Sequence, residues 1–134
     1  MTLTFRRIPS SEVSPELVKV ARRAARDAAD ILRLGDISIR WVDRFASEKA
    51  IGWIDPRWPD HVHLAADWCE QMGPEQTRAL VFHECRHVWQ EKTMRYVGYG
   101  EKARAEDDAE SFSFRHTRTM IERPDYKWRY QDYV

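Results

Sequence analysis

The sequence predicts an α+β fold in which a small, mostly antiparallel sheet of three or more strands packs against helices. Three observations support this prediction: one long helical pattern near the start, three short strand-like runs after it, and two further helical patterns. In chain order these segments are residues 15–34, 37–43, 51–55, 61–65, 74–93 and about 101–121. With 134 residues, the chain is expected to form one domain spanning 1–134.

The first helix has a clear beginning and end in the sequence. Ser14 can accept a hydrogen bond as the N-cap, Pro15 fits the first helical position, and Glu16 lies at the positive end of the helix dipole. Apolar residues then recur at helical spacing as far as Leu34. Gly35 is expected to end the helix because glycine readily adopts the left-handed conformation found there.

Strands are predicted where apolar and polar residues alternate or β-branched residues cluster. The first run has a two-residue period, and the second is a shorter candidate. A turn with two prolines is expected at 56–60, before the third strand. His61 and His63 share one face of that third strand. They could bind a metal there, but lining a solvated or cleft-facing surface is the commoner role.

The most informative motif is the H-E-x-x-H sequence His83-Glu84-Cys85-Arg86-His87, which lies in an apolar helical segment. Two histidines four positions apart lie one turn apart on the same helix face, so both can bind one zinc ion at about 2.0–2.1 Å. Glu84 is placed to act as a general base toward a zinc-activated water. Catalytic zinc sites usually have three protein ligands, so another residue must supply the third.

A second helix is predicted to follow a loop and return against the first. Glu106 lies 19 positions after His87, and Glu110 is four positions further on. Both glutamates flank one stripe of the helix, which contains Ala105, Ala109, Phe112 and His116. We expect His116 to be a buried, hydrogen-bonded histidine rather than a metal ligand.

Together the two motifs resemble those of the gluzincin metallopeptidases, and especially the small ImmA/IrrE-like and minigluzincin peptidases of prokaryotes and their phages. The resemblance covers roughly residues 74–121 and implies a minimal zincin fold. It implies that Glu106 is the third zinc ligand and that Glu110 is an outer carboxylate that orients a ligand histidine. There are two departures: Arg86 stands where a small residue is common, and Glu110 replaces the usual Asp.

The resemblance implies a zinc metalloendopeptidase that cleaves peptides or proteins, with Zn²⁺ as cofactor and Glu84 as general base. A peptide substrate would pair with an edge strand, supplied by either 51–54 or 61–65. Candidate donors to the developing oxyanion are Tyr96, Tyr99, Arg115, His116 and Tyr126. Two alternatives stay open: a non-catalytic zinc-binding interaction domain whose cleft is blocked, for example by Arg86 or the tail, and a peptidase of narrow specificity that acts on a regulatory protein.

Composition excludes several other classes of function. The chain has 22 basic and 22 acidic residues, so no bulk charge attracts it to nucleic acid or to an anionic membrane. No stretch approaches the roughly 20 apolar residues of a membrane span, and the start lacks the apolar core of a signal peptide. We therefore expect a cytoplasmic protein, whose oligomeric state is left open.

Two further features concern the cysteines and the C-terminal tail. Cys69 and Cys85 are not expected to form a disulfide or to bind zinc, and Cys85 is expected to pack as a small apolar residue. Residues 122–134 form an aromatic-rich tail. We expect this tail to pack over the sheet or the helices, with a cover over the cleft or a dimer contact as alternatives.

Overall fold

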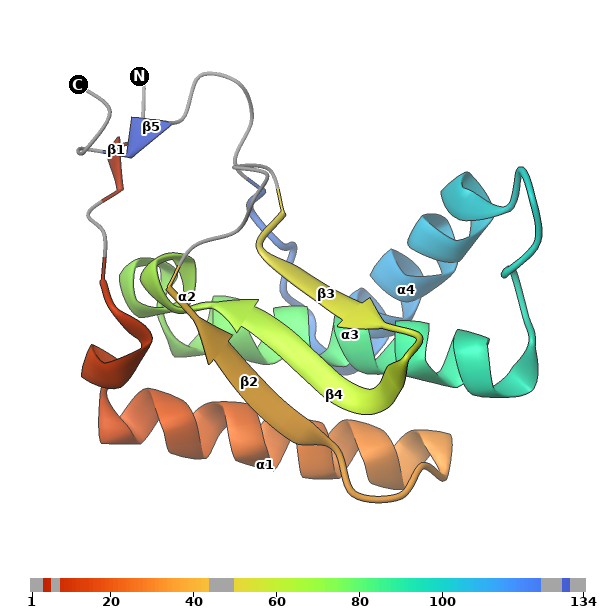
Figure 1. Ribbon diagram of the computed structural model, residues 1–134, viewed down its shortest axis with the longest axis horizontal. Helices are drawn as coiled ribbons and strands as arrows, with labels where there is room; N and C mark the ends of the chain where they lie inside the picture. The colour runs from red at the N-terminus through yellow and green to blue at the C-terminus, as the bar shows by residue number, and fades with distance from the viewer. Residues whose placement is uncertain (1–3, 6–7, 44–49, 124–128, 131–134) are drawn as a thin grey trace.

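The computed structural model describes residues 4–5, 8–43, 50–123 and 129–130. Within these residues the fold is α+β, with helices packed against a small mixed sheet (Figure 1). The elements in chain order are β1 (Thr4–Phe5), the 3₁₀ helix η1 (Ser10–Glu12), α1 (Pro15–Leu32), β2 (Ser38–Val42), β3 (Gly52–Asp55), β4 (Trp58–Ala65), α2 (Ala66–Met72), α3 (Pro74–Thr93), α4 (Lys102–Thr117) and β5 (Arg129–Tyr130).

Helix α1 begins as predicted and ends slightly earlier. The Ser14 hydroxyl accepts a hydrogen bond from the backbone N–H of Leu17 at 3.3 Å, which confirms the N-cap. The predicted end at Gly35 is wrong, because Arg33 already adopts the left-handed conformation with φ of 57°. The N–H of Leu34 then bonds to the carbonyl of Ala29 at 2.8 Å, so the last turn is closed without glycine.

The sheet has the strand order β2-β4-β3, with β4 in the centre. β3 and β4 pair antiparallel, whereas β2 and β4 pair in parallel, so the expectation of a mostly antiparallel sheet is corrected to a mixed one. Three successive strands that run up, down and up leave the first and third pointing the same way. When the third strand inserts between the other two, a parallel pair results.

The turn between β3 and β4 is shorter than the prolines suggest. Only residues 56–57 form the turn, and Pro59 lies inside β4. Pro59 is tolerated there because the pairing of β3 with β4 shifts register between Ile54 and Asp55. A residue beside such an irregularity does not need to donate a ladder hydrogen bond.

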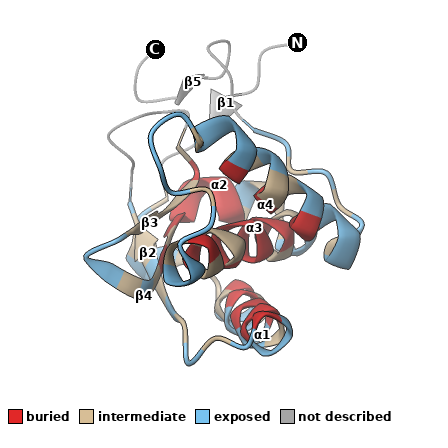
Figure 2. Cartoon of the chain, turned by 90° about the vertical axis from the view of Figure 1, so that its right-hand side faces the viewer, coloured by how far each residue is buried: buried red, intermediate tan, exposed pale blue. Residues whose placement is uncertain are grey.

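Helix α3 lies at the centre of the fold and packs against α1, α4, β3 and β4 (Figure 2). It spans the predicted range of 74–93, and its middle is almost fully buried. The core around it is made of Leu80, Val81, Phe82, Cys85, Val88, Val62, Leu64, Trp68, Phe112 and the alanines of α1. Because this helix is packed on most sides, the polar side chains on its remaining face are held rigidly.

Helix α2 is an element that the sequence patterns did not predict. Ala66, Asp67, Trp68 and Cys69 are all buried, and the helix has only seven residues, which is too short for a helical period to stand out in the sequence. Burial raises the pKa of the Cys69 thiol to about 12, and Cys85 is likewise buried with a raised pKa. Both cysteines are free, as expected.

Helix α4 ends at Thr117, about four residues before the predicted end. Arg118 adopts the left-handed conformation, with φ of 57°, and stops the helix. Within α4, the buried Ser113 hydroxyl donates to the carbonyl of Ala79 on α3 at 2.7 Å. This bond sets the register of α4 against α3, and therefore the height of its glutamates relative to the histidines.

Part of the predicted tail can be described. Residues 129–130 form β5, which pairs in parallel with β1 near the start of the chain. The remaining expectations for the tail concern residues 124–128 and 131–134, which lie outside the described residues. Among the residues that the structure does describe, no helix has the length and apolar character needed to cross a membrane.

Candidate metal centre

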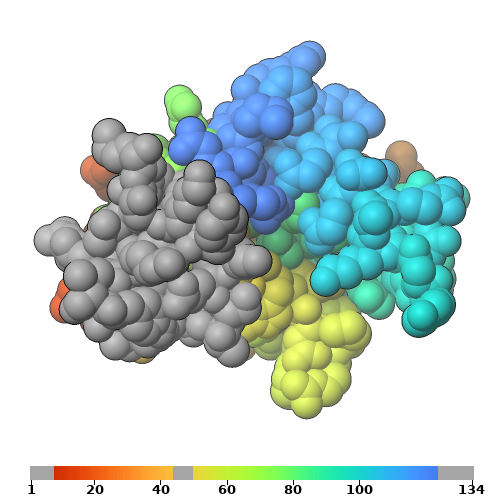
Figure 3. Space-filling model, turned by 90° about the horizontal axis from the view of Figure 1, so that it is seen from above, coloured from red at the N-terminus to blue at the C-terminus, as the bar shows by residue number. Residues whose placement is uncertain are grey.

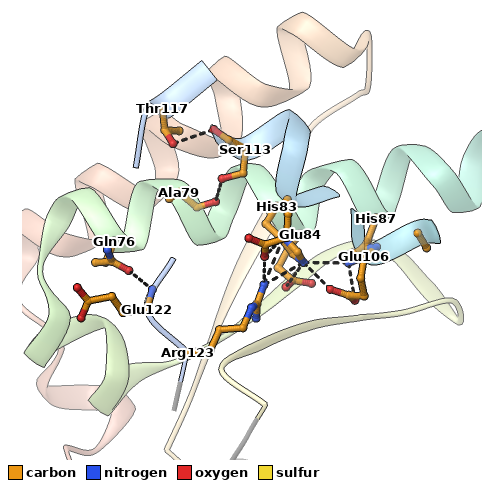
Figure 4. Close-up of polar contacts among 12 residues, drawn as sticks. Gln76, Ala79, His83, Glu84, His87, Glu106, Ser113, Thr117, Glu122 and Arg123 are labelled. Carbon is orange, nitrogen blue, oxygen red and sulfur yellow. Dashed lines mark hydrogen bonds and ion pairs between the residues drawn. The ribbon is translucent and has the colours of Figure 1, made fainter. Parts of the chain in front are cut away.

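His83 and His87 project from one face of α3 toward the same point (Figure 4). Their Nε2 atoms lie 3.1 Å apart, and their rings meet edge to face with centroids 4.8 Å apart. The His83 side chain is 1% exposed, whereas His87 is half-buried at the cleft. The spacing of four residues on a helix therefore converges the two imidazoles as the sequence predicts.

Glu106 of α4 meets both histidines with one carboxylate. Its Oε2 lies 3.1 Å from Nε2 of His83, and its Oε1 lies 3.0 Å from Nε2 of His87. Ligands at zinc distances around a tetrahedral ion are separated by about 3.3 Å, close to these separations. Among the described residues, His83, His87 and Glu106 form a group that could hold a metal ion.

Glu84 lies beside this group rather than in it. Its Oε2 is 4.0 Å from Nε2 of His83, and its side chain is 4% exposed. Burial raises the pKa of this carboxyl group above its ordinary value. Gly52 of β3 faces Glu84 closely, since a Cβ atom on Gly52 would lie 3.2 Å from Glu84 Oε2. The absence of a side chain at residue 52 leaves room for the carboxylate.

Glu110 lies one turn beyond Glu106 and contacts the other side of His83. Its Oε1 is 3.0 Å from Nδ1 of His83. The hydrogen bond to His83 lowers the pKa of Glu110 to about 2. Burial alone would lower the pKa of His83, but hydrogen bonds with Glu106 and Glu110 raise it to about 9. The longer side chain of Glu therefore reaches the histidine that an Asp was expected to contact.

Arg123 is a residue of this site that the sequence patterns did not identify. Its guanidinium donates to Glu110, and its Nη2 lies 3.3 Å from Nε2 of His83 (Figure 4). Arg123 follows the end of α4 and begins the aromatic tail, where the sequence pattern drew attention only to the aromatic residues. No local pattern distinguishes it from the other exposed arginines of the chain.

The segment before Arg123 is held by two buried or half-buried side chains. Gln76 donates to the carbonyl of Met120 at 2.8 Å and accepts from the N–H of Glu122 at 2.9 Å. Trp68 Nε1 donates to the carbonyl of Glu122 at 3.2 Å. These hydrogen bonds from α3 and α2 fix the backbone of the segment after α4, which places Arg123 beside His83.

A cleft of about 360 Å³ opens at the candidate centre between β3, α3, the loop after α3 and α4. From above, α3 is visible at its floor between α4 and the strands (Figure 3). The cleft is lined by Gly52, Trp53, Ile54, His83, Glu84, His87, Gln90, Glu91, Tyr96, Val97, Gly98, Lys102, Ala105, Glu106 and Arg123.

Of the predicted oxyanion donors that the structure describes, only Tyr96 lies at the cleft. Tyr96 lines the cleft, whereas Tyr99 is fully exposed on the loop and is not among the lining residues. Arg115 is exposed on α4 and also lies outside the lining. The expectation that His116 is buried is wrong, since it is exposed with its ring 4.6 Å from that of Phe112. Tyr126 lies outside the described residues.

The strand order decides which of the two predicted segments is the edge of the sheet. Because β4 is the central strand, 61–65 does not supply an edge, and β3 is the edge strand that borders the cleft.

His61 and His63 are half-buried on β4, and His63 stacks on Trp53 with ring centroids 4.9 Å apart. Neither histidine belongs to the group that could hold a metal.

Arg86 does not enter the cleft either. Its guanidinium pairs with Asp108 of α4 at 2.7 Å and lies 3.8 Å from the ring centroid of Trp89. Arg86 is not among the described residues that line the cleft, so its side chain does not block the cleft.

The charges of the centre suit a divalent cation. Glu84, Glu106 and Glu110 provide three carboxyl groups, against one guanidinium from Arg123. The raised pKa of His83 has the same origin, because its neighbours stabilise a positive charge there. Comparison with protein-family models, with curated proteins and with solved structures finds no match to this chain.

Proposed function

We propose that the protein is a zinc-dependent metallopeptidase with a minimal zincin fold. The observation that carries the proposal is the position of Glu106, whose carboxylate meets Nε2 of both His83 and His87 at 3.0–3.1 Å. Two histidines and one glutamate are the protein ligands of well-known catalytic zinc sites. The excess of carboxyl groups and the adjacent cleft support a site that binds a cation and admits a substrate.

Zinc held by these residues would polarise a peptide carbonyl and lower the pKa of a water from 15.7 towards about 7. Glu84 would accept the proton of the attacking water and pass it to the leaving amine. Its burial supports this role, since a carboxylate with a raised pKa is a stronger base than an exposed one. Glu110 would hold His83 through Nδ1.

Substrate binding would use the edge of the sheet and the basic group at the cleft. An extended peptide could add to β3 through backbone hydrogen bonds, since β3 is an edge strand bordering the cleft. Arg123 is the donor that we propose for the developing oxyanion, because its guanidinium lies 3.3 Å from Nε2 of His83. Tyr96, which also lines the cleft, is the second candidate for this role.

The proposal is tested by metal content and cleavage measured on the same samples. Purified protein should contain about one zinc per chain, and His83→Ala and His87→Ala should lose it, whereas His61→Ala should keep it. Glu84→Gln should bind zinc like the wild type while cleavage of a peptide library falls by about 10²–10⁴-fold. Glu75→Gln, on the exposed first turn of α3, is the matched control and should change neither property.

The alternatives give different outcomes in the same experiment. Stoichiometric zinc without cleavage of any library peptide would reject a general peptidase and favour either a zinc-binding interaction domain or a peptidase of narrow specificity. Full zinc occupancy in both histidine variants would reject the metal site itself.

A further inference from the structure

Gln90 is a buried amide one turn beyond His87 on α3, with 2% of its surface exposed. Its Nε2 lies 2.9 Å from the carbonyl oxygen of Ala105 and 2.9 Å from Oδ2 of Asp108. Both partners belong to α4, and a carbonyl and a carboxylate can only accept hydrogen bonds. The nitrogen of the amide must therefore point toward α4, since the reverse orientation would place its oxygen against two other oxygens.

This orientation determines what Gln90 offers to His87. Its Oε1 lies 2.8 Å from Nδ1 of His87, and an amide oxygen only accepts. Nδ1 must therefore carry a hydrogen. Without a metal the Glu106 carboxylate can accept a second hydrogen from Nε2, and in the neutral ring that Gln90 favours the lone pair is on Nε2. That nitrogen lies 3.0 Å from Glu106 and 3.1 Å from Nε2 of His83, at the candidate metal centre. An imidazole binds a metal through the unprotonated nitrogen.

Asp108 is itself held in place by Arg86. The guanidinium donates to both carboxylate oxygens, from Nε at 2.7 Å and from Nη2 at 3.1 Å. It also lies 3.8 Å from the ring centroid of Trp89 and 5.1 Å from that of Phe112. A bidentate pair packed against two rings has little freedom, so the acceptor that orients Gln90 is fixed.

We propose that Gln90 is a positioning residue that holds His87 in the tautomer with hydrogen on Nδ1, and that Asp108 and the Ala105 carbonyl impose this choice. The residues form a chain of hydrogen bonds in which His87 donates to Gln90, and Gln90 and Arg86 both donate to Asp108. The Glu110 carboxylate contacts Nδ1 of His83 in the same way. Each histidine is therefore oriented by a different residue outside the candidate metal ligands. The effect on metal binding rests on the proposed zinc site, whereas the tautomer does not.

The test starts with the tautomer of His87 in metal-free protein, read from ¹⁵N chemical shifts at a pH where the imidazole is neutral. Every sample for this reading carries Glu106→Ala, so that the carboxylate 3.0 Å from Nε2 does not compete for the hydrogen, and zinc binding is measured with Glu106 intact. Protein with Gln90 should have hydrogen on Nδ1. Gln90→Leu, which keeps the size but removes the acceptor, should lose this preference and weaken zinc binding by about 10–100-fold. Gln71→Leu, on the exposed side of α2, is the matched control and should change neither readout.

Hydrogen on Nε2 in protein with Gln90 would overturn the proposal, and this result does not depend on whether Gln90→Leu folds. The same tautomer with Gln90 and with Gln90→Leu would also overturn it. If protein with Gln90 has the Nδ1 hydrogen, Gln90→Leu loses it and neither protein binds zinc when Glu106 is intact, the role of Gln90 stands and the proposed function fails.

Discussion

The guanidinium of Arg123 donates a hydrogen bond to the carboxylate of Glu110, although the two residues lie on different segments and 13 positions apart. Glu110 also lies 3.0 Å from Nδ1 of His83. The carboxylate is thus shared between a permanent cation and a histidine of the candidate centre. This arrangement connects the segment after α4 to the candidate metal centre. It leads to separate predictions for Glu106, Glu110 and Arg123.

Glu106 should matter more for metal affinity than Glu110. Glu106→Gln removes a charged ligand, whereas Glu110→Gln removes an outer partner of His83, for which a loss of about 10–100-fold is typical. We expect Glu106→Gln to lose stoichiometric zinc and Glu110→Gln to retain it with weakened affinity, measured by competition with a chelator. The opposite order would mean that the zinc ligand of α4 is Glu110.

Replacing Arg123 should affect metal binding and cleavage in opposite directions. Arg123→Gln removes a positive charge near the centre, so zinc affinity should rise by about three- to tenfold, a modest gain because the side chain is 38% exposed and screened by solvent. Cleavage should fall by about a hundredfold if the guanidinium stabilises the oxyanion. Arg118→Gln, exposed on the same segment, is the control. A drop in zinc affinity would contradict the charge argument.

Gly52 should be sensitive to the addition of a single methyl group. A Cβ atom there would lie 3.1 Å from Cγ of Glu84 and 3.1 Å from Cδ1 of Leu80, which is tighter than ordinary packing. Gly52→Ala should destabilise the protein by about 1–3 kcal/mol in denaturant unfolding. Because Glu84 must move, cleavage should fall more than zinc affinity does.

Gly35→Ala is the matched control for this substitution, since a Cβ atom at residue 35 meets nothing within 4 Å. Equal loss of zinc affinity and cleavage in Gly52→Ala would show that the glycine serves the fold as a whole rather than the position of Glu84.

The turn between β3 and β4 should make stability depend on pH. The Asp55 carboxylate accepts hydrogen bonds from the side chain and backbone of Arg57, which lower its pKa from 3.8 to about 2. A depressed pKa in the folded state means that the pair stabilises the fold above about pH 4 and loses this contribution as pH falls through about 2. The effect is modest because the pair is open to solvent.

The measurement is the difference in melting temperature between wild type and Asp55→Asn. This difference should be present near neutral pH and should close at about pH 2. Asp36→Asn, which removes an exposed carboxylate before β2, is the matched control. A difference that stays constant across this range would mean that the substitution acts through something other than the carboxylate charge.

Much of the site could be predicted because it depends on spacing within one helix. The four-residue interval between His83 and His87 brings their rings together in any α-helix, and the predicted range of α3 is confirmed. The N-cap at Ser14 and the burial of Cys85 within its apolar helix follow from equally local properties. For Glu106, the family resemblance indicated the approach to both histidines, and its role as a zinc ligand stays a prediction.

The remaining features depend on contacts between residues far apart in the chain, which no local pattern encodes. Insertion of β4 between β2 and β3 made the sheet mixed and left β3 as the strand at the cleft. Helix α2 is hidden from pattern analysis because it has only seven residues, and its first turn is buried by contacts with other segments. His116 follows the helical stripe of Phe112 and its ring lies near that of Phe82 on α3, yet it is exposed, which the spacing along α4 does not reveal.

The sequence by itself determined the residue types of the centre and the helix that carries two of them, since a helix fixes the geometry of residues one turn apart. Only the tertiary structure decided how these groups are held. Asp108 orients Gln90 across the contact between α3 and α4, and Gln76 and Trp68 guide the chain that brings Arg123 to His83. Buried polar groups must find partners, and which partners they find is decided by packing between segments rather than by their order in the chain.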